Sequence, residues 1–114
     1  MKVVRAVPVE TLSEQVHVKR LTEELGALKL RANVWSLAEG AQMRRHRHRE
    51  QEELYLVLAG DAEIEVDGAI YKLGERDAFA VPPGTVRQLS NVGAGPLTFV
   101  VVAAPPVPGD GEMV

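Results

Sequence analysis

Hydrophobic and polar residues alternate with the two-residue period of β-strands along most of this chain. In Ala62–Val66, three apolar side chains would share one face and two glutamates the other, which predicts a strand buried on one side. Further strands are predicted over Gln15–Leu21, Ala27–Leu37, Glu53–Ala59, Ala69–Leu73, Asp77–Val81, Val86–Asn91 and Leu97–Ala103. Helical periodicity is scarce, and the short helix that Thr11–Gly26 could form is less favoured than a strand, because valines flank His17.

Tight turns separate several of these predicted strands. Asp67 and Gly68 would supply the two left-handed residues of a hairpin turn. Pro82-Pro83-Gly84 predicts a second turn, because the second proline fixes φ and the glycine can take a positive φ. Many short strands joined by glycine and proline turns predict a single all-β domain, either a sandwich or a barrel.

Composition narrows the partners of this domain. The chain has 114 residues, of which 46% are hydrophobic and 25% are charged, and its net charge of −3 arises from mixed signs. We therefore expect neither nucleic acid nor a membrane as partner, and no apolar run approaches the length of a membrane span. No secretory signal is evident and there are no cysteines, so we expect a cytoplasmic protein without disulfides or thiolate sites.

Candidate chemistry is concentrated in Gly40–Gly60, which reads GAQMRRHRHREQEELYLVLAG. His46 and His48 lie two residues apart, so on a strand their imidazoles would point to the same face. Glu53 follows five residues later and could reach the same point from the next strand. Two neutral nitrogens and one carboxylate predict a divalent transition metal, namely iron, manganese, nickel or zinc, and no organic cofactor is expected.

These residues and their spacing resemble the cupins. The first cupin motif, G-x5-H-x-H-x4-E-x6-G, is met in full by Gly40, His46, His48, Glu53 and Gly60. The second, G-x5-P-x-G-x2-H-x3-N, is met in part: Pro82, Gly84 and Asn91 are in place, but Arg76 replaces the opening glycine and Arg87 replaces the histidine.

The resemblance implies a small antiparallel jelly-roll β-barrel with its site inside. It also implies a homodimer that exchanges amino-terminal strands. The chain then divides into amino-terminal strands over residues 1–26, the barrel over residues 27–104 and a tail over residues 105–114. The tail is rich in proline and glycine, so we expect it to be extended or disordered.

Arg87 occupies the position that the resemblance implies for a fourth metal ligand. Arginine stays protonated and has no lone pair to offer, and its charge repels a nearby cation. In one arrangement Arg87 swings away, and His46, His48 and Glu53 hold the metal with open positions. In the other, Arg87 turns inward, pairs with Glu53 in place of the ion, and uses the rest of its guanidinium to bind an anionic ligand.

Three further residues are candidates for contact with a ligand. Tyr55 shares a strand face with Glu53, and Arg44 shares one with His46 at the expected cavity mouth. Trp35 is expected in core or interface packing, with ligand stacking as the alternative. The remaining side chains of interest are expected to be ordinary, with Arg45, Arg47, Arg49 and His17 on the surface and Tyr71 and Phe79 in the core.

Two functions from different classes fit these residues. The first is a metal-dependent oxygenase or isomerase acting on a small organic molecule, with His46, His48 and Glu53 as metal ligands. The second is a metal-free module that binds or senses a small anion through Arg87 and Glu53. Signatures of nucleophilic hydrolases, phosphate-binding loops and dinucleotide-binding folds are all missing.

Overall fold

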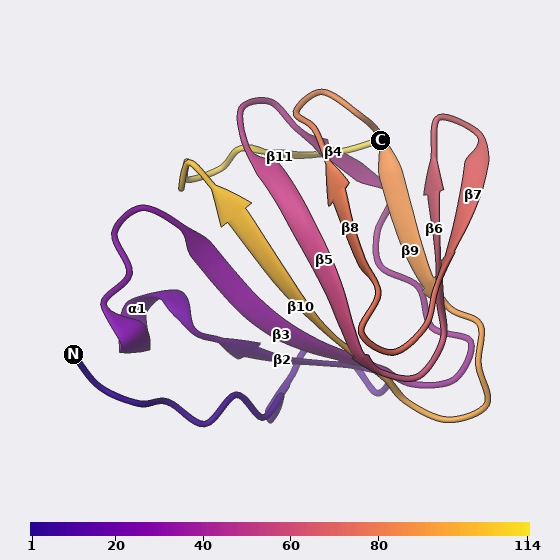
Figure 1. Cartoon of the computed structure of the whole chain (residues 1–114), viewed down its shortest axis with the longest axis horizontal. Helices are drawn as coiled ribbons and strands as arrows, with labels where there is room; N and C mark the ends of the chain where they lie inside the picture. Colours follow the sequence, from indigo (N-terminus) through magenta and orange to yellow (C-terminus); the bar gives the residue numbers. More distant parts are fainter.

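Two antiparallel β-sheets face each other in the structure, a computed structural model that describes residues 1–114 (Figure 1). The larger sheet has the strand order β1-β2-β3-β10-β5-β8 and the smaller has the order β11-β4-β9-β6-β7. The elements are β1 (Glu10–Thr11), β2 (Val16–Arg20), α1 (Thr22–Leu25), β3 (Arg31–Leu37), β4 (His46–His48), β5 (Glu52–Ala59), β6 (Ala62–Val66), β7 (Ala69–Leu73), β8 (Ala78–Val81), β9 (Arg87–Asn91), β10 (Leu97–Ala104) and β11 (Gly111–Met113). The predicted all-β jelly roll is confirmed, and no helix has the length and apolarity needed to cross a membrane.

The inner faces of the two sheets form one hydrophobic core. Ile64 of the smaller sheet and Val57 and Phe99 of the larger are all fully buried in it. On β6 the predicted alternation is confirmed, because Ala62 and Ile64 are buried while the intervening Glu63 is partly exposed. Burial of each large apolar side chain stabilises the fold by about 1.5–3 kcal/mol, so this core holds the sheets together.

The predicted turns are present with the expected backbone geometry. Asp67 and Gly68 have φ angles of 50° and 82°, so the hairpin between β6 and β7 contains two left-handed residues. Gly84 has a φ of 80° in the turn between β8 and β9. Both turns therefore use the residue types that the sequence pattern requires there.

The first part of the chain forms the edge of the larger sheet. The strand expected around His17 is present as β2, and α1 is a single turn that ends at Gly26 with a φ of 69°. Within the chain, β1 pairs with β2 and β2 pairs with β3. A small apolar cluster of Leu21, Ala32 and Val34 packs on the outer side of β3.

Tyr71 does not lie in the core, so that prediction is wrong. Tyr71 is 45% exposed, and its ring packs on the ring of Phe79 with 4.8 Å between the centroids. Tyr71 lies on β7, the edge strand of the smaller sheet, where only Leu73 is buried. Phe79, by contrast, is partly buried against the core as expected.

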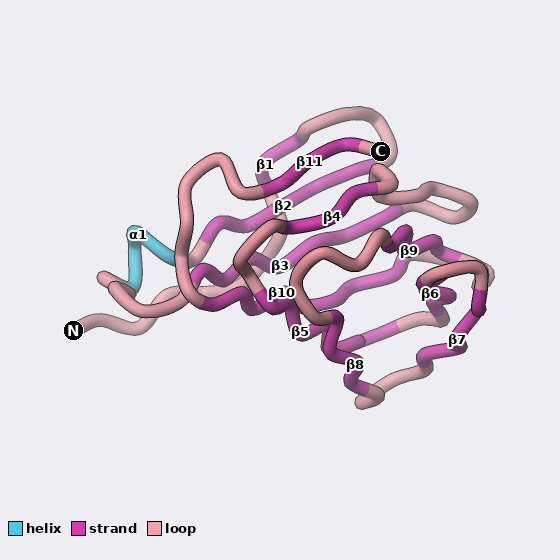
Figure 2. The backbone as a smooth tube through the Cα atoms, turned by 90° about the horizontal axis from the view of Figure 1, so that it is seen from above, coloured by secondary structure: helices cyan, strands magenta, loops and turns pink.

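The carboxyl-terminal tail returns to the smaller sheet. Its last strand, β11, pairs antiparallel with β4, and Gly111 is opposite His48 in this register. In Figure 2, β11 lies beside β4 close to the end of the chain. The tail is therefore extended, and it borders the strand that carries both candidate histidines.

Arg76 has an unusual backbone conformation. Its φ is 68°, in the left-handed region that favours glycine, and its side chain is exposed. This is the position at which the second cupin motif has glycine, so an arginine here retains the backbone geometry at a steric cost.

We expect Arg76→Gly to raise the free energy of unfolding by about 0.5–1 kcal/mol, because relief of the left-handed strain exceeds the added flexibility of the unfolded chain. Urea unfolding of the purified variant measures this change. Arg76→Ala is the control, since it removes the same side chain but keeps the Cβ, and it should give no gain. An equal gain in both variants would show that backbone strain is not the cause.

Candidate metal centre

The two sheets bring the three predicted ligands together. His46 and His48 point inward from β4 of the smaller sheet, and Glu53 points inward from β5 of the larger sheet. His46 Nε2 lies 3.4 Å from Glu53 Oε1, and His48 Nε2 lies 3.2 Å from Glu53 Oε2. One potential ligand atom from each residue lies within 4.8 Å of the other two, so all three groups face one shared point.

The outer nitrogens of both rings face acceptors in the protein. His46 Nδ1 is 2.9 Å from the carbonyl oxygen of Arg44, which can only accept, so Nδ1 carries the hydrogen. His48 Nδ1 is 3.5 Å from Asp110 Oδ2. In a neutral ring of this tautomer the Nε2 lone pair faces the Glu53 carboxylate. Two acceptors at this distance repel unless a proton or a metal cation lies between them.

Glu53 is the centre of a buried polar network. The Tyr55 hydroxyl donates to Glu53 Oε1 at 2.9 Å, and Arg31 Nη2 donates to Oε2 at 3.2 Å. Arg87 Nη2 lies 3.4 Å from Oε1. Together with the two histidines, these groups surround the carboxylate from strands of both sheets.

The pKa values reflect this network. Burial by itself would raise the pKa of Glu53, but the imidazoles of His46 and His48 beside the carboxylate hold that pKa well below its ordinary value. The pKa of Tyr55 is raised, first by burial and then by the adjacent Glu53 charge. Glu53 is therefore an ionised carboxylate and Tyr55 a neutral donor.

Arg87 takes the inward position. It lies directly opposite His46 in the pairing of β9 with β4, and its side chain is 0% exposed. Nη1 donates to the carbonyl of Thr85 at 2.8 Å, while Nη2 faces Glu53. The guanidinium thus lies behind the carboxylate and does not line the cavity described next. Gln88 has the opposite orientation and donates to Met43.

A cavity of about 500 Å³ opens on the site. Trp35, Arg44 and Tyr55, which were predicted to contact a ligand, all line it. Arg31 and Asn33 line it too, although neither was expected in the site. Their alternation with Trp35 on β3 was the available signal, because residues two apart on a strand share a face.

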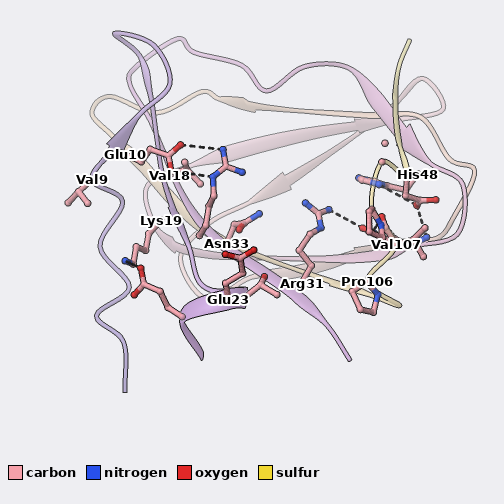
Figure 3. A pocket seen from close by; sticks show the side chains of 18 residues that line it. Val9, Glu10, Val18, Lys19, Glu23, Arg31, Asn33, His48, Pro106 and Val107 are labelled. Atoms are coloured by element: carbon pink, nitrogen blue, oxygen red, sulfur yellow. Dashed lines mark hydrogen bonds and ion pairs between the residues drawn. The ribbon is translucent and has the colours of Figure 1, made fainter. Parts of the chain in front are cut away.

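A second, more polar cavity of about 730 Å³ shares part of its lining with the first. Arg31, Asn33, His48 and Gly111 line both cavities. Figure 3 shows Arg31, His48 and Val107 grouped at one end of this second cavity. The tail thus lines both spaces, through Gly111.

The donor set fits a divalent transition metal held by three protein ligands. Two imidazole nitrogens and one carboxylate leave coordination positions open for a ligand or water. Arg87 supplies no fourth ligand, and its charge lowers the affinity of the site for a cation. A metal could be held by His46, His48 and Glu53, more weakly than in a four-ligand site.

Comparison with known proteins agrees with this fold. A family model described as a cupin domain matches residues 33–103. Over 89 residues the chain is 32% identical to the mannose-1-phosphate guanylyltransferase of Escherichia coli, covering 78% of this chain and 16% of that protein. The chain therefore spans about a sixth of the length of that relative.

Solved structures with a similar fold agree with the family match. A sugar phosphate isomerase from Silicibacter pomeroyi superposes with a TM-score of 0.79 at 27% identity, covering 89% of this chain and 66% of that chain. A protein with a double-stranded β-helix domain from Klebsiella pneumoniae superposes with a TM-score of 0.80 at 24% identity, covering 93% of this chain and 90% of that chain. This second likeness shows the fold.

The lowered pKa of Glu53 predicts a loss of stability in acid. Because the folded-state pKa lies below the ordinary 4.5, the unfolded chain binds more protons in this range. The free energy of unfolding of the metal-free protein should therefore fall as pH decreases below 4.5, and Glu53→Gln should flatten this part of the profile. Urea unfolding at a series of pH values with a chelator present measures both. The same slope in both proteins would contradict the assignment.

Proposed function

The chain belongs to the cupin family, and we propose that it binds a divalent transition metal through His46, His48 and Glu53 together with a small organic anion. The observation that supports the metal is the facing geometry of the two Nε2 atoms and the carboxylate. This geometry leaves a gap that only a positive species can fill favourably.

The charges around the site support an anionic ligand. Arg31 and Arg87 contact Glu53, and Asp110 lies beside His48, so these four charges sum to zero. A divalent metal would raise this sum to +2, while Arg44 adds a further positive charge to the cavity wall. A carboxylate or phosphate in the cavity would neutralise this excess, so the metal and the anion should strengthen each other's binding.

Arg31 is the residue best placed to hold such an anion. Its Nη2 is engaged by Gln51 and Glu53, and no hydrogen bond within the chain uses its Nη1. The side chain lines the cavity next to Asn33, which adds an amide. The planar guanidinium matches the geometry of a carboxylate or phosphate.

Isomerisation is the reaction class that these features support best. A bound metal would supply Lewis-acid polarisation of a carbonyl or hydroxyl oxygen on the ligand. The similar structure from Silicibacter pomeroyi is described as a sugar phosphate isomerase, and a phosphate would suit the cavity arginines. Isomerisation also needs no oxidant, in contrast to the oxygenase reaction that the same ligand set could serve.

A metal-free binding module is the second candidate function. The ion pair between the buried Arg87 and Glu53 favours it, because this arginine already supplies positive charge to the carboxylate. Since Arg87 does not line the cavity, Arg31 and Arg44 would hold the anion in this case. The homodimer, the cytoplasmic location and the absence of a nucleic-acid partner stay predictions.

Metal content separates the two candidates. Protein purified without a histidine tag and loaded with Mn(II), Fe(II), Ni(II) or Zn(II) should hold about one ion per chain, measured by elemental analysis after desalting. His46→Ala should lower metal affinity at least about 100-fold, because one of three ligands is lost. His17→Ala is the matched control and should bind as the wild type does. Absence of metal after loading with all four ions would contradict the proposed metal function.

Arg87→His should raise metal affinity about 10–100-fold, because it removes a repelling charge and offers a fourth ligand. Arg87→Leu removes the charge without adding a ligand, so its affinity should lie between those of the wild type and Arg87→His. Competition with a chromophoric chelator measures all three. An unchanged affinity in Arg87→His would show that this side chain does not act on the metal site.

A further inference from the structure

The carboxyl-terminal tail carries a buried carboxylate to the metal centre. Asp110, immediately before β11, is 5% exposed, and its Oδ2 lies 3.5 Å from His48 Nδ1. We infer that Asp110 is a positioning residue that holds the His48 ring with hydrogen on Nδ1 and a free Nε2. This inference rests on the proposed metal function, since the free Nε2 is the atom that would bind the ion.

The Asp110 carboxylate is itself held in place. It accepts hydrogen bonds from the backbone N–H of Glu50 at 3.1 Å and of Gln51 at 3.0 Å. These two residues form the turn between β4, which carries both histidines, and β5, which carries Glu53. One side chain therefore fixes both the turn that joins the ligand strands and the orientation of a ligand ring.

His48 has no alternative partner on that side. Its Nδ1 is buried and makes no hydrogen bond that meets normal geometry, and the Asp110 carboxylate lies 3.5 Å from it as an ion-pair partner. The ring also packs closely on the backbone of β11, because a Cβ built at Gly111 would lie 3.3 Å from His48 Cε1. Asp110 and Gly111 together restrict both the rotation and the tautomer of the ring.

The tail reaches the same centre by a second route. Gln51 donates from Nε2 to the carbonyl of Val107 at 2.9 Å and accepts at Oε1 from Arg31 Nη2 at 2.9 Å. The same Arg31 nitrogen donates to Glu53 Oε2. Figure 3 shows Val107, Arg31 and His48 close to one another. Contacts from the tail thus extend to two of the three proposed ligands.

The opposite face of β11 offers a matched control. Glu112 pairs there with Arg47 at 2.8 Å and with Arg49, so it fastens the strand without facing the site. Loss of Glu112 should weaken the attachment of β11 but leave His48 with its acceptor. The two carboxylates therefore separate positioning of the ring from general anchoring of the strand.

Asp110→Leu removes the acceptor with little change in side-chain size. Without an acceptor at Nδ1, the Glu53 carboxylate 3.2 Å from Nε2 favours the tautomer with hydrogen on Nε2. That hydrogen blocks the nitrogen proposed to bind metal. Loss of such a supporting carboxylate typically lowers metal affinity about 10–100-fold.

The test is ¹H–¹⁵N NMR of histidine-labelled, metal-free protein at a pH of about 8, above the ordinary histidine pKa of about 6.5. The wild type should show His48 with hydrogen on Nδ1, and Asp110→Leu should shift it to Nε2. Metal affinity, measured by chelator competition, should fall in Asp110→Leu and stay within about twofold of wild type in Glu112→Gln.

Several outcomes would overturn the inference. Hydrogen on His48 Nε2 in the wild type would do so even if Asp110→Leu did not fold, and so would an unchanged tautomer in that variant. An equal loss of metal affinity in Glu112→Gln would show that strand anchoring, and not Asp110, is responsible. Failure of the wild type to bind metal would instead overturn the proposed function, while the NMR result would still decide the role of Asp110.

Discussion

The ionised carboxylate of Glu53, buried between the sheets, is the constraint on which the site depends. Burial of an unpaired charge costs several kcal/mol, so the fold must surround it with donors and positive charge. Arg31 from β3, Arg87 from β9 and the two histidines from β4 meet this requirement. Because these strands belong to both sheets, the interactions of one side chain link the two halves of the jelly roll at the site.

The replacement of a ligand histidine by Arg87 changes the balance of charge. A fixed positive charge partly satisfies Glu53 before any ion binds, which weakens the affinity for a metal but favours anions near it. The two proposed functions have one feature in common, because both place an anion beside Arg31 in the cavity. They differ only in whether a metal occupies the gap between His46, His48 and Glu53.

Much of this arrangement could be predicted from short-range patterns. Strand alternation predicted the sheets, and the spacing of His46 and His48 predicted that their rings share a face, as they do. Arg31 was missed although it alternates with Trp35 on one strand, whereas Asp110 was missed because it meets the site only through pairing of segments far apart in the chain. No local pattern in a tail rich in proline and glycine indicates that one of its carboxylates is buried.

The central claim is that His46 Nε2, His48 Nε2 and a Glu53 oxygen together bind one metal ion. Anomalous diffraction from crystals grown with Mn(II) or Zn(II) tests this claim most directly. The account predicts a single peak inside the jelly roll, about 2.0–2.2 Å from each of these three atoms. A structure that shows no peak there, with Arg87 and the histidines still closed around Glu53, would contradict it.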